Sequence, residues 1–206
     1  MAQSAQQRLT QAERTEISDQ RMFEATVGLL IEYGPAGTSL KEVGVRAGYS
    51  RGLASHRFGS KDKLFDFTLR RLGEMWLDQL KDATNGRVGL DAIEHAIDQH
   101  LQFCVDAPDY VRTFYMLWFE SMNVSSELSV TIQGIHQRRF QDVVNWILND
   151  PEIAEKIKRE ADSIAAQFSA TVIGIVYYWL ANPEKTNETK RLHDGLKHTM
   201  SRLLNN

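Results

Sequence analysis

Residues 38–65 read TSLKEVGVRAGYSRGLASHRFGSKDKLF, and this stretch decides the fold. Two short runs with helical spacing of apolar residues, 40–47 and 51–58, stand on either side of Gly48. Glycine tolerates the backbone angles of a tight turn that other residues avoid. The pattern predicts two short helices locked at a steep angle, as in a helix-turn-helix.

Residues that cap helices stand where the elements of this motif would begin. Thr38 or Ser39 is expected to cap the first short helix, Ser50 the second, and Ser60 a longer helix that follows. Upstream, apolar residues from Ile17 to Tyr33 recur at helical spacing before Gly34-Pro35 stops the run. The helices predicted in the first eighty residues are 13–33, about two turns after Ser39, 51–58 and 61–82.

The remaining sequence predicts further helices and almost no strand. Only 4 prolines and 13 glycines are present, and the alternating pattern of a strand is nearly absent. We therefore expect an all-α protein with two parts, one over 16–76 that contains the helix-turn-helix at 39–58, and a larger helical part over 77–206. Helix breaks are expected at 84–89, 107–108, 123–126, 149–151 and 182–187.

The net charge of −3 is unevenly distributed along the chain. Between Ser39 and Arg71, eight basic residues face three acidic ones, a local charge of +5, whereas from Leu72 onward thirteen basic face nineteen acidic residues. A short basic segment on an acidic body is typical of a protein that binds a polyanion at one end. The alternative is a basic excess that only solvates one face.

Several classes of protein are disfavoured by the composition. The first residues lack the apolar core of a signal peptide, and no stretch was expected to reach the roughly 18 apolar residues of a membrane span, so we expect a cytoplasmic protein. Cys104 has no partner cysteine for a disulfide or a zinc site. His95 and His100 are five apart, poor spacing for one helical face. We expect no catalytic site, no metal and no cofactor.

The stretch resembles the DNA-binding domain of the TetR family of regulators, over residues 16–76. The matching residues are Ala47-Gly48, Ser50, Gly52, His56, Phe58 and Ser60-Lys61-Asp62. The sequence departs from the family inside the second short helix, where Ala54 and Ser55 replace a usual leucine and tyrosine and Arg57 an aromatic residue. The resemblance implies a transcriptional regulator, by default a repressor, that binds a palindromic operator as a dimer and answers to a small molecule.

The resemblance also assigns roles to single residues. Arg51 and Leu53 would contact bases or sugars, and Lys61 would hold a phosphate together with its backbone amide. Two alternatives stay open: Ser50 is a cap rather than a base reader, and His56 packs against its aromatic neighbours instead of contacting DNA. The full set of expected DNA-binding residues is Thr38, Ser39, Arg51, Gly52, Leu53, Ser55, His56 and Lys61.

Residues 100–119 are unusually aromatic, which favours an apolar ligand pocket with a few polar residues that orient the ligand. Aromatic residues at helical spacing are also typical of an ordinary core. We expect a small apolar or aromatic effector. The candidate pocket residues are His100, Phe103, Phe114, Trp118, Glu120, His136, Gln167 and Tyr177.

Two C-terminal helices predict a homodimer. Residues 161–181 are apolar on more than one side and contain small residues that allow close helix approach, and 188–204 carry a single apolar stripe. The pair would form a four-helix interface with its copy in a second chain. The alternative is that both helices only close the core of the monomer.

A second class of function remains open from the sequence. A dimeric ligand- or protein-binding module could keep this architecture and lack operator recognition. The intact Arg51, His56 and Lys61 and the local charge of +5 argue against that alternative. Binding to a defined operator that depends on salt would separate the two.

Overall fold

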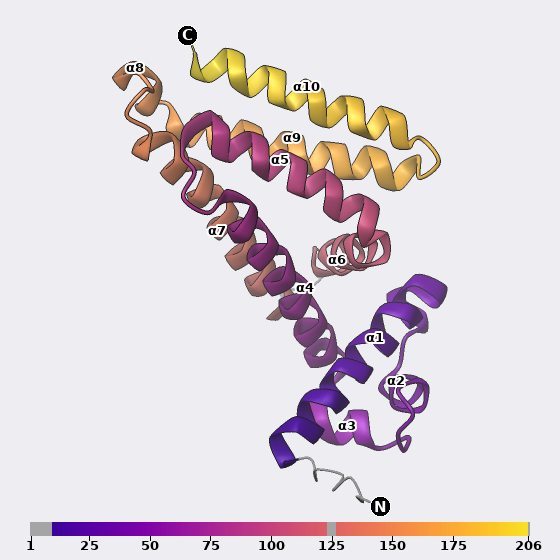
Figure 1. The fold of residues 1–206 in the computed structure, drawn as a ribbon. Coiled ribbons are helices and arrows are strands. Elements are labelled where there is room, and N and C mark those ends of the chain that lie inside the picture. The colour runs from indigo at the N-terminus through magenta and orange to yellow at the C-terminus, as the bar shows by residue number, and fades with distance from the viewer. Residues whose placement is uncertain (1–9, 123–126, 206) are drawn as a thin grey trace, which may run out of the picture.

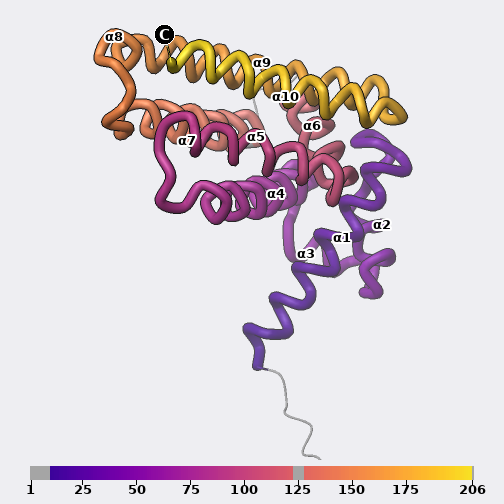
Figure 2. The backbone as a smooth tube through the Cα atoms, turned by 45° about the horizontal axis from the view of Figure 1, so that its top comes forward, coloured from indigo at the N-terminus to yellow at the C-terminus, as the bar shows by residue number. Residues whose placement is uncertain are grey.

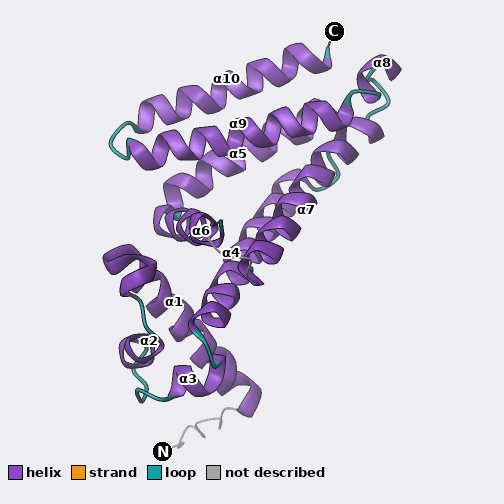
Figure 3. Ribbon diagram, turned by 180° about the vertical axis from the view of Figure 1, so that it is seen from behind, coloured by secondary structure: helices purple, strands orange, loops and turns teal. Residues whose placement is uncertain are grey.

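The computed structural model describes residues 10–122 and 127–205, and within these ranges it contains helices and no strand (Figures 1 and 3). The all-α expectation is confirmed. The predicted break at 123–126 lies outside the described residues. The helices are α1 (Gln11–Gly37), α2 (Leu40–Arg46), α3 (Leu53–Phe58), α4 (Lys61–Thr84), α5 (Gly89–Asp106), α6 (Pro108–Ser121), α7 (Glu127–Asn149), α8 (Glu155–Lys158), α9 (Ala161–Ala181) and α10 (Thr186–Leu204).

Helices α1 to α3 and the first turns of α4 form a small head at one end of the molecule (Figure 1). These helices pack against one another through apolar side chains. One buried cluster includes residues that are at most 2% exposed, namely Phe23 and Leu30 of α1, Val43 of α2 and Phe65 of α4. Helix α1 loses its helical geometry at Gly34, the residue expected to stop it. The short segments around the predicted motif therefore fold against a shared core.

Three residues that the periodicity placed with the apolar stripes of the head, Ile17, Tyr33 and Val45, are exposed. Val45 is 52% exposed because it stands two positions after the buried Val43, and residues two apart point to different sides of a helix. Tyr33 is 62% exposed and occupies the last regular turn of α1, just before the break at Gly34. The stripe is accordingly shorter than predicted at both helices.

The rest of the chain forms a helical body above the head (Figures 1 and 2). Helix α4 runs from the head into this body and packs against α5 and α7. Helices α9 and α10 lie side by side and cover α7 and α5 respectively. The head meets the body a second time where α1 packs against α6.

The boundary expected between residues 76 and 77 falls inside α4. Trp76 belongs to a buried cluster that also includes Phe23 and Leu64 of the head and Leu117 of α6. The apolar core is thus continuous from the head into the lower body. A second cluster fills the space between α5, α7, α9 and α10.

Helix α9 corrects one sequence expectation. It is 21 residues long and apolar enough to pass the length and composition criteria for a membrane span, although we expected no such segment. Its apolar character has a physical origin in the fold, because α7 packs on one side of it and α10 on another. Buried residues such as Ile164, Phe168, Val172 and Ile175 fill these contacts.

An ion pair between Arg57 of α3 and Asp19 of α1 should contribute to the stability of the head. The guanidinium donates from Nε and Nη2 to the two carboxylate oxygens, at 2.9 and 2.6 Å, and Asp19 is only 7% exposed. We expect Arg57→Ala to lower the free energy of unfolding by about 1–3 kcal/mol, because it leaves a buried carboxylate without its partner. Urea unfolding measures the change.

Arg51→Ala is the matched control, because Arg51 is exposed and forms no ion pair with a described carboxylate. Its effect on the same unfolding curve should stay within about 0.5 kcal/mol. Equal losses for the two variants would contradict the structural role of the pair.

Candidate nucleic-acid interface and ligand cavity

Ser39, and not Thr38, caps α2. The Ser39 hydroxyl accepts from the Glu42 N–H at 3.3 Å and donates to the Glu42 carboxylate at 2.7 Å. Thr38 is 1% exposed, and its hydroxyl donates to the Gly34 carbonyl at 2.9 Å. The expectation that the Thr38 side chain contacts a phosphate is therefore wrong, since the group is buried and already bonded. Ser39 remains at the surface.

The turn between α2 and α3 depends on two glycines. Gly48 has a φ of +82°, a conformation that other residues adopt rarely. At Gly44, a Cβ atom would lie 2.8 Å from the Ser50 carbonyl oxygen and 3.8 Å from the Ala54 Cβ, so the two helices approach closely here. Ala54 is fully buried in this contact. The small residue at 54 thus serves the packing of the motif.

The second helix of the motif begins later than predicted. We expected Ser50 to cap a helix starting at Arg51, but α3 starts at Leu53, and Gly52 occupies the N-cap position without a side-chain bond. The reason is a tight turn at 51–52, in which the Leu53 N–H donates to the Ser50 carbonyl at 3.1 Å. Ser50 acts through its backbone, and Arg51 lies in the turn that precedes the helix.

The expected reading residues lie at the surface of the head. His56 is exposed, which removes the alternative that it packs in the core against Tyr49 or Phe58. Phe58 itself is buried, as a core residue. Of the expected set in this segment, Arg51, Gly52, Ser55 and His56 are exposed and Leu53 is half-buried.

The basic residues between Ser39 and Arg71 divide into two groups. Four arginines are bound by carboxylates of the chain itself, in the pairs Arg46–Glu32, Arg57–Asp19, Arg70–Asp66 and Arg71–Glu16. Lys41, Arg51, Lys61 and Lys63 form no ion pair with a carboxylate of the described residues. These four cations stand in α2, in the turn before α3 and in the first turn of α4. The unpaired positive charge therefore gathers around the reading motif, residues 39–58.

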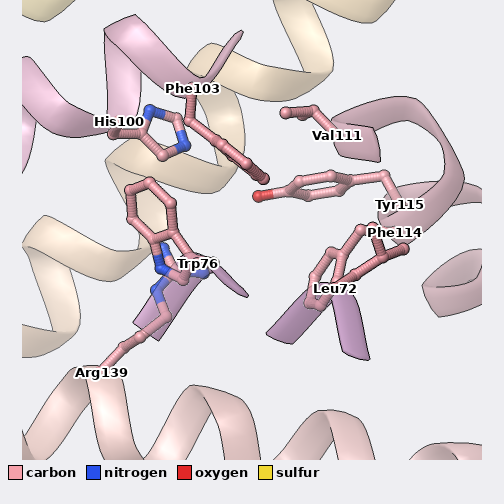
Figure 4. Close-up of a pocket in the computed structure, with 8 residues that line it drawn as sticks. All are labelled: Leu72, Trp76, His100, Phe103, Val111, Phe114, Tyr115 and Arg139. Carbon is pink, nitrogen blue, oxygen red and sulfur yellow. The ribbon is translucent and has the colours of Figure 1, made fainter. Parts of the chain in front are cut away.

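A small cavity with about 30 Å³ of open space lies in the body between α4, α5, α6 and α7 (Figure 4). Its wall is mostly aromatic, and three of the residues expected in a ligand pocket belong to it: His100, Phe103 and Phe114. Its lining consists of Leu72, Trp76, His100, Phe103, Val111, Phe114, Tyr115 and Arg139.

The other five candidate pocket residues do not line this cavity. Trp118 and His136 pack on each other, with ring centroids 4.4 Å apart. Glu120 is exposed near the end of α6. Gln167 and Tyr177 lie on an outward face of α9, where Tyr177 is 65% exposed. Helical spacing alone did not show which face of α6, α7 or α9 points inward.

Sequence reasoning missed Arg139 and Tyr115 as cavity residues. Arg139 follows Arg138, and such a pair in a polar helix is typical of a solvated surface. Only Arg138 is exposed, whereas Arg139, one position further around α7, is half-buried and reaches the cavity. The placement of Arg139 three residues after His136 is the one signal that could have suggested a shared inward face.

His100 is held by a second buried histidine. His193 Nδ1 lies 2.8 Å from the Thr189 carbonyl oxygen, which can only accept, so this nitrogen carries the proton. His193 Nε2 then accepts from His100 Nδ1–H at 2.9 Å. Burial, together with His193 and Arg139, lowers the pKa of His100 well below its usual 6.5, and burial lowers the pKa of His193. Both rings are neutral at pH 7.

The similarity in sequence to known proteins is found mainly in the head. Residues 23–66 match the sequence pattern of the bacterial regulatory proteins of the tetR family. The HTH-type transcriptional repressor Rv3405c of Mycobacterium tuberculosis is 33% identical over 79 residues, which cover 38% of this chain and 40% of the repressor. The head therefore carries the sequence pattern of the TetR family, and the chain spans about 40% to 64% of the length of the curated relatives that it matches.

Solved structures share the fold of this protein over nearly the whole chain. A transcriptional regulator from Rhodococcus sp. Rha1 has a TM-score of 0.78 at 24% identity, with 91% of this chain and 96% of that chain covered. A putative transcriptional regulator from Saccharomonospora viridis, solved in complex with choline, has a TM-score of 0.77 at 15% identity, with 90% and 96% covered. At these identities the likeness concerns the fold.

His136 should make the stability of the protein depend on pH. Burial and the nearby Arg139 lower its pKa from 6.5 to about 4. Between these values the unfolded chain binds a proton that the folded chain does not, so stability present above pH 6.5 is lost as the pH falls toward 4. In His136→Gln, the loss of unfolding free energy between pH 7 and 5 should be smaller by about 1–2 kcal/mol.

His198→Gln is the control, because His198 lies exposed on α10. Urea unfolding at the two pH values should give His198→Gln the same pH dependence as the unsubstituted chain. A pH dependence left unchanged by His136→Gln would contradict the assignment.

Proposed function

We propose that this protein is a DNA-binding transcriptional regulator, a repressor, that binds a palindromic operator as a homodimer and responds to a small apolar or aromatic effector. The observation that carries the proposal is the set of exposed residues Arg51, Ser55 and His56 beside the unpaired cations of the head. The TetR family consists of regulators, and the Mycobacterium tuberculosis relative is named a repressor. In the cytoplasm such a protein meets DNA directly.

The unpaired cations favour operator binding over a module without DNA function. These four cations form no ion pair with another described residue: Lys41, Arg51, Lys61 and Lys63. The Nζ atom of Lys61 lies 5.4 Å from the centre of the Phe65 ring. Phosphate contacts supply affinity and base contacts supply specificity. We assign Lys61 with Ser39 to phosphates, and Arg51 to a base edge.

Dimerisation through α9 and α10 is supported by the residues that these helices leave exposed. On α9 they include Ala166, Ala170, Gly174 and Tyr177, which recur every three or four positions and so share one face. Small residues at this spacing let two helices approach closely. On α10 the matching exposed residues are Leu192, Gly195 and Thr199. The alternative, that both helices only close the monomer core, leaves this apolar face without a role.

The effector acts through α6. One turn of this helix carries Phe114 and Tyr115 into the cavity wall, and the preceding turn carries Tyr110, whose hydroxyl donates to Glu24 of α1 at 2.8 Å. Tyr110 also packs edge-on against Phe23, with ring centroids 5.5 Å apart. A ligand that shifts α6 therefore shifts the head, and with it the separation of about 34–36 Å that two heads need on successive major grooves.

Arg51→Ala should weaken binding to the operator and reduce its discrimination from other DNA. An arginine that reads a guanine contributes about 1–3 kcal/mol, or roughly 5- to 150-fold, and this contribution is lost for the operator alone. Fluorescence anisotropy with the DNA that flanks the gene, at two salt concentrations, measures both affinities. The control is Arg138→Ala, an exposed arginine on α7 in the body.

Two other results of this binding experiment would contradict the proposed role of Arg51. If Arg51→Ala and the unsubstituted chain bind operator and random DNA alike at both salt concentrations, the protein lacks operator recognition and the binding-module alternative stands. Equal weakening on both DNAs would place Arg51 on a phosphate.

Gly174→Glu should dissociate the dimer without disturbing the monomer. A Cβ atom at Gly174 meets no atom within 4 Å in the chain, so the added side chain has room in the monomer and would clash only with a partner. The control is Gly134→Glu on α7, which introduces the same side chain at another glycine where a Cβ atom meets no atom within 4 Å.

Sedimentation equilibrium and thermal unfolding together check this expectation. We expect a monomer for Gly174→Glu and a dimer for Gly134→Glu, with helical content unchanged in both. A Gly174→Glu chain that remains dimeric would place the interface elsewhere.

A further inference from the structure

One buried donor at the cavity lacks an acceptor, and the guanidinium beside it, which bonds to the Tyr115 side chain, lacks a carboxylate. Trp76 is 8% exposed, and its Nε1 is buried without a hydrogen-bond partner. Arg139 has no carboxylate of the described residues within ion-pair distance, and its Cζ lies 6.0 Å from the centre of the Trp76 ring. Figure 4 shows the guanidinium beside the indole at one end of the cavity. Since a buried donor without an acceptor costs free energy, the place suits a group rich in acceptors.

The cavity carries positive charge and no compensating negative charge. His100 is neutral at pH 7, because burial lowers its pKa, and the neighbouring histidine that holds it is neutral as well. Burial also raises the pKa of Tyr115, although the nearby Arg139 acts in the opposite direction, so the phenol keeps its proton. Arg139 is thus the sole charged residue among the eight that line the cavity.

We propose that this cavity binds a small aromatic carboxylate, whose oxygens accept from Trp76 Nε1 and the Arg139 guanidinium while its ring packs among Phe103, Phe114 and Tyr115. The inference rests on the proposed function, because it names the chemical class of the effector. A planar guanidinium is the side chain best suited to a carboxylate, since it donates two parallel hydrogen bonds. The aromatic wall supplies the apolar contact area.

The open space in this cavity is small, about 30 Å³, which is room for only a few water molecules. A ligand with a single ring and a short acidic substituent therefore enters only when the aromatic side chains of the wall move apart. A second cavity with about 20 Å³ of open space lies next to the first, and Trp76, His100 and Arg139 line both spaces. These three residues form the partition between the cavities.

The sign of the charge separates this pocket from one for a quaternary ammonium ion. The structural neighbour from Saccharomonospora viridis was solved with choline, a cation. A cation placed in the present cavity would meet Arg139 and find no carboxylate among the residues that line it. Like charges in a buried site repel strongly, so cationic ligands are disfavoured here.

Isothermal titration calorimetry on the full-length chain tests the proposal with three probes of similar shape: phenylacetate, neutral benzyl alcohol and cationic benzyltrimethylammonium. We expect phenylacetate to bind at least about tenfold more tightly than either of the others. Arg139→Gln should lower its affinity by roughly 10- to 100-fold, and Trp76→Phe, which keeps an aromatic ring and removes the donor, by a smaller factor.

Arg138→Gln is the matched control, because it removes an exposed charge from the neighbouring position and should leave phenylacetate affinity unchanged. Thermal unfolding checks that each variant is folded. Equal or weaker binding of phenylacetate than of benzyl alcohol, equal losses in Arg138→Gln and Arg139→Gln, or the absence of binding by all three probes would each overturn the carboxylate assignment.

Operator binding is measured on the same preparations without any probe. If operator binding is intact while the carboxylate preference fails, the ligand class is wrong and the proposed regulator stands. If operator binding fails as well, the proposed function itself is at fault.

Discussion

The continuity of α4 is the constraint on which the other parts of the structure depend. Its first turns belong to the core of the head through Leu64 and Phe65, and its later turns supply Leu72 and Trp76 to the cavity wall. The helix starts at a fixed place because the Ser60 hydroxyl accepts from the Lys63 N–H at 3.2 Å. A stiff helix with one end in each part transmits a tilt, so the packing around the cavity and the position of the head are mechanically linked.

A second constraint is the way the head uses its charges. Arginines that are paired within the chain, such as Arg57 with Asp19, fix α3 against α1, and Arg70 with Asp66 fixes a turn of α4. Asp66 also accepts from the Thr131 hydroxyl of α7, which ties the start of α4 to the body. The net basic charge of this segment therefore overstates the charge available to a polyanion. What remains lies around the reading motif, where a phosphate backbone would run.

The helix starts and the turn of the head could be predicted from the sequence, because they depend on residues that are neighbours in the chain. Caps at Ser39 and Ser60, and the turn at Gly48, are properties of neighbouring residues, and the structure has them. The prediction failed where a backbone bond replaced a side-chain cap, at Ser50, and where burial depended on tertiary contacts, at Thr38. The TetR-like pattern located the reading surface but could not show which arginines are already paired.

The cavity was less predictable than the head for a related reason. The aromatic content of α5 and α6 pointed to His100, Phe103 and Phe114, but which faces of α7 and α9 turn inward depends on packing between distant segments. Arg139 became visible only once α7 was placed beside α4. No pattern in the sequence around Arg139 indicates that it lines a cavity, because its neighbours in the sequence are typical of a helix surface.

We propose that the head, α4 and the cavity act together in one regulator, and that two copies of the chain hold their heads one DNA turn apart. Hydroxyl-radical footprinting of the full-length chain on the DNA that flanks its gene tests this claim most directly. The account predicts two protected half-sites of an inverted repeat whose centres lie about 10 base pairs, or a multiple of that, apart. A single protected site without a repeat, or uniform weak protection along the fragment, would contradict it.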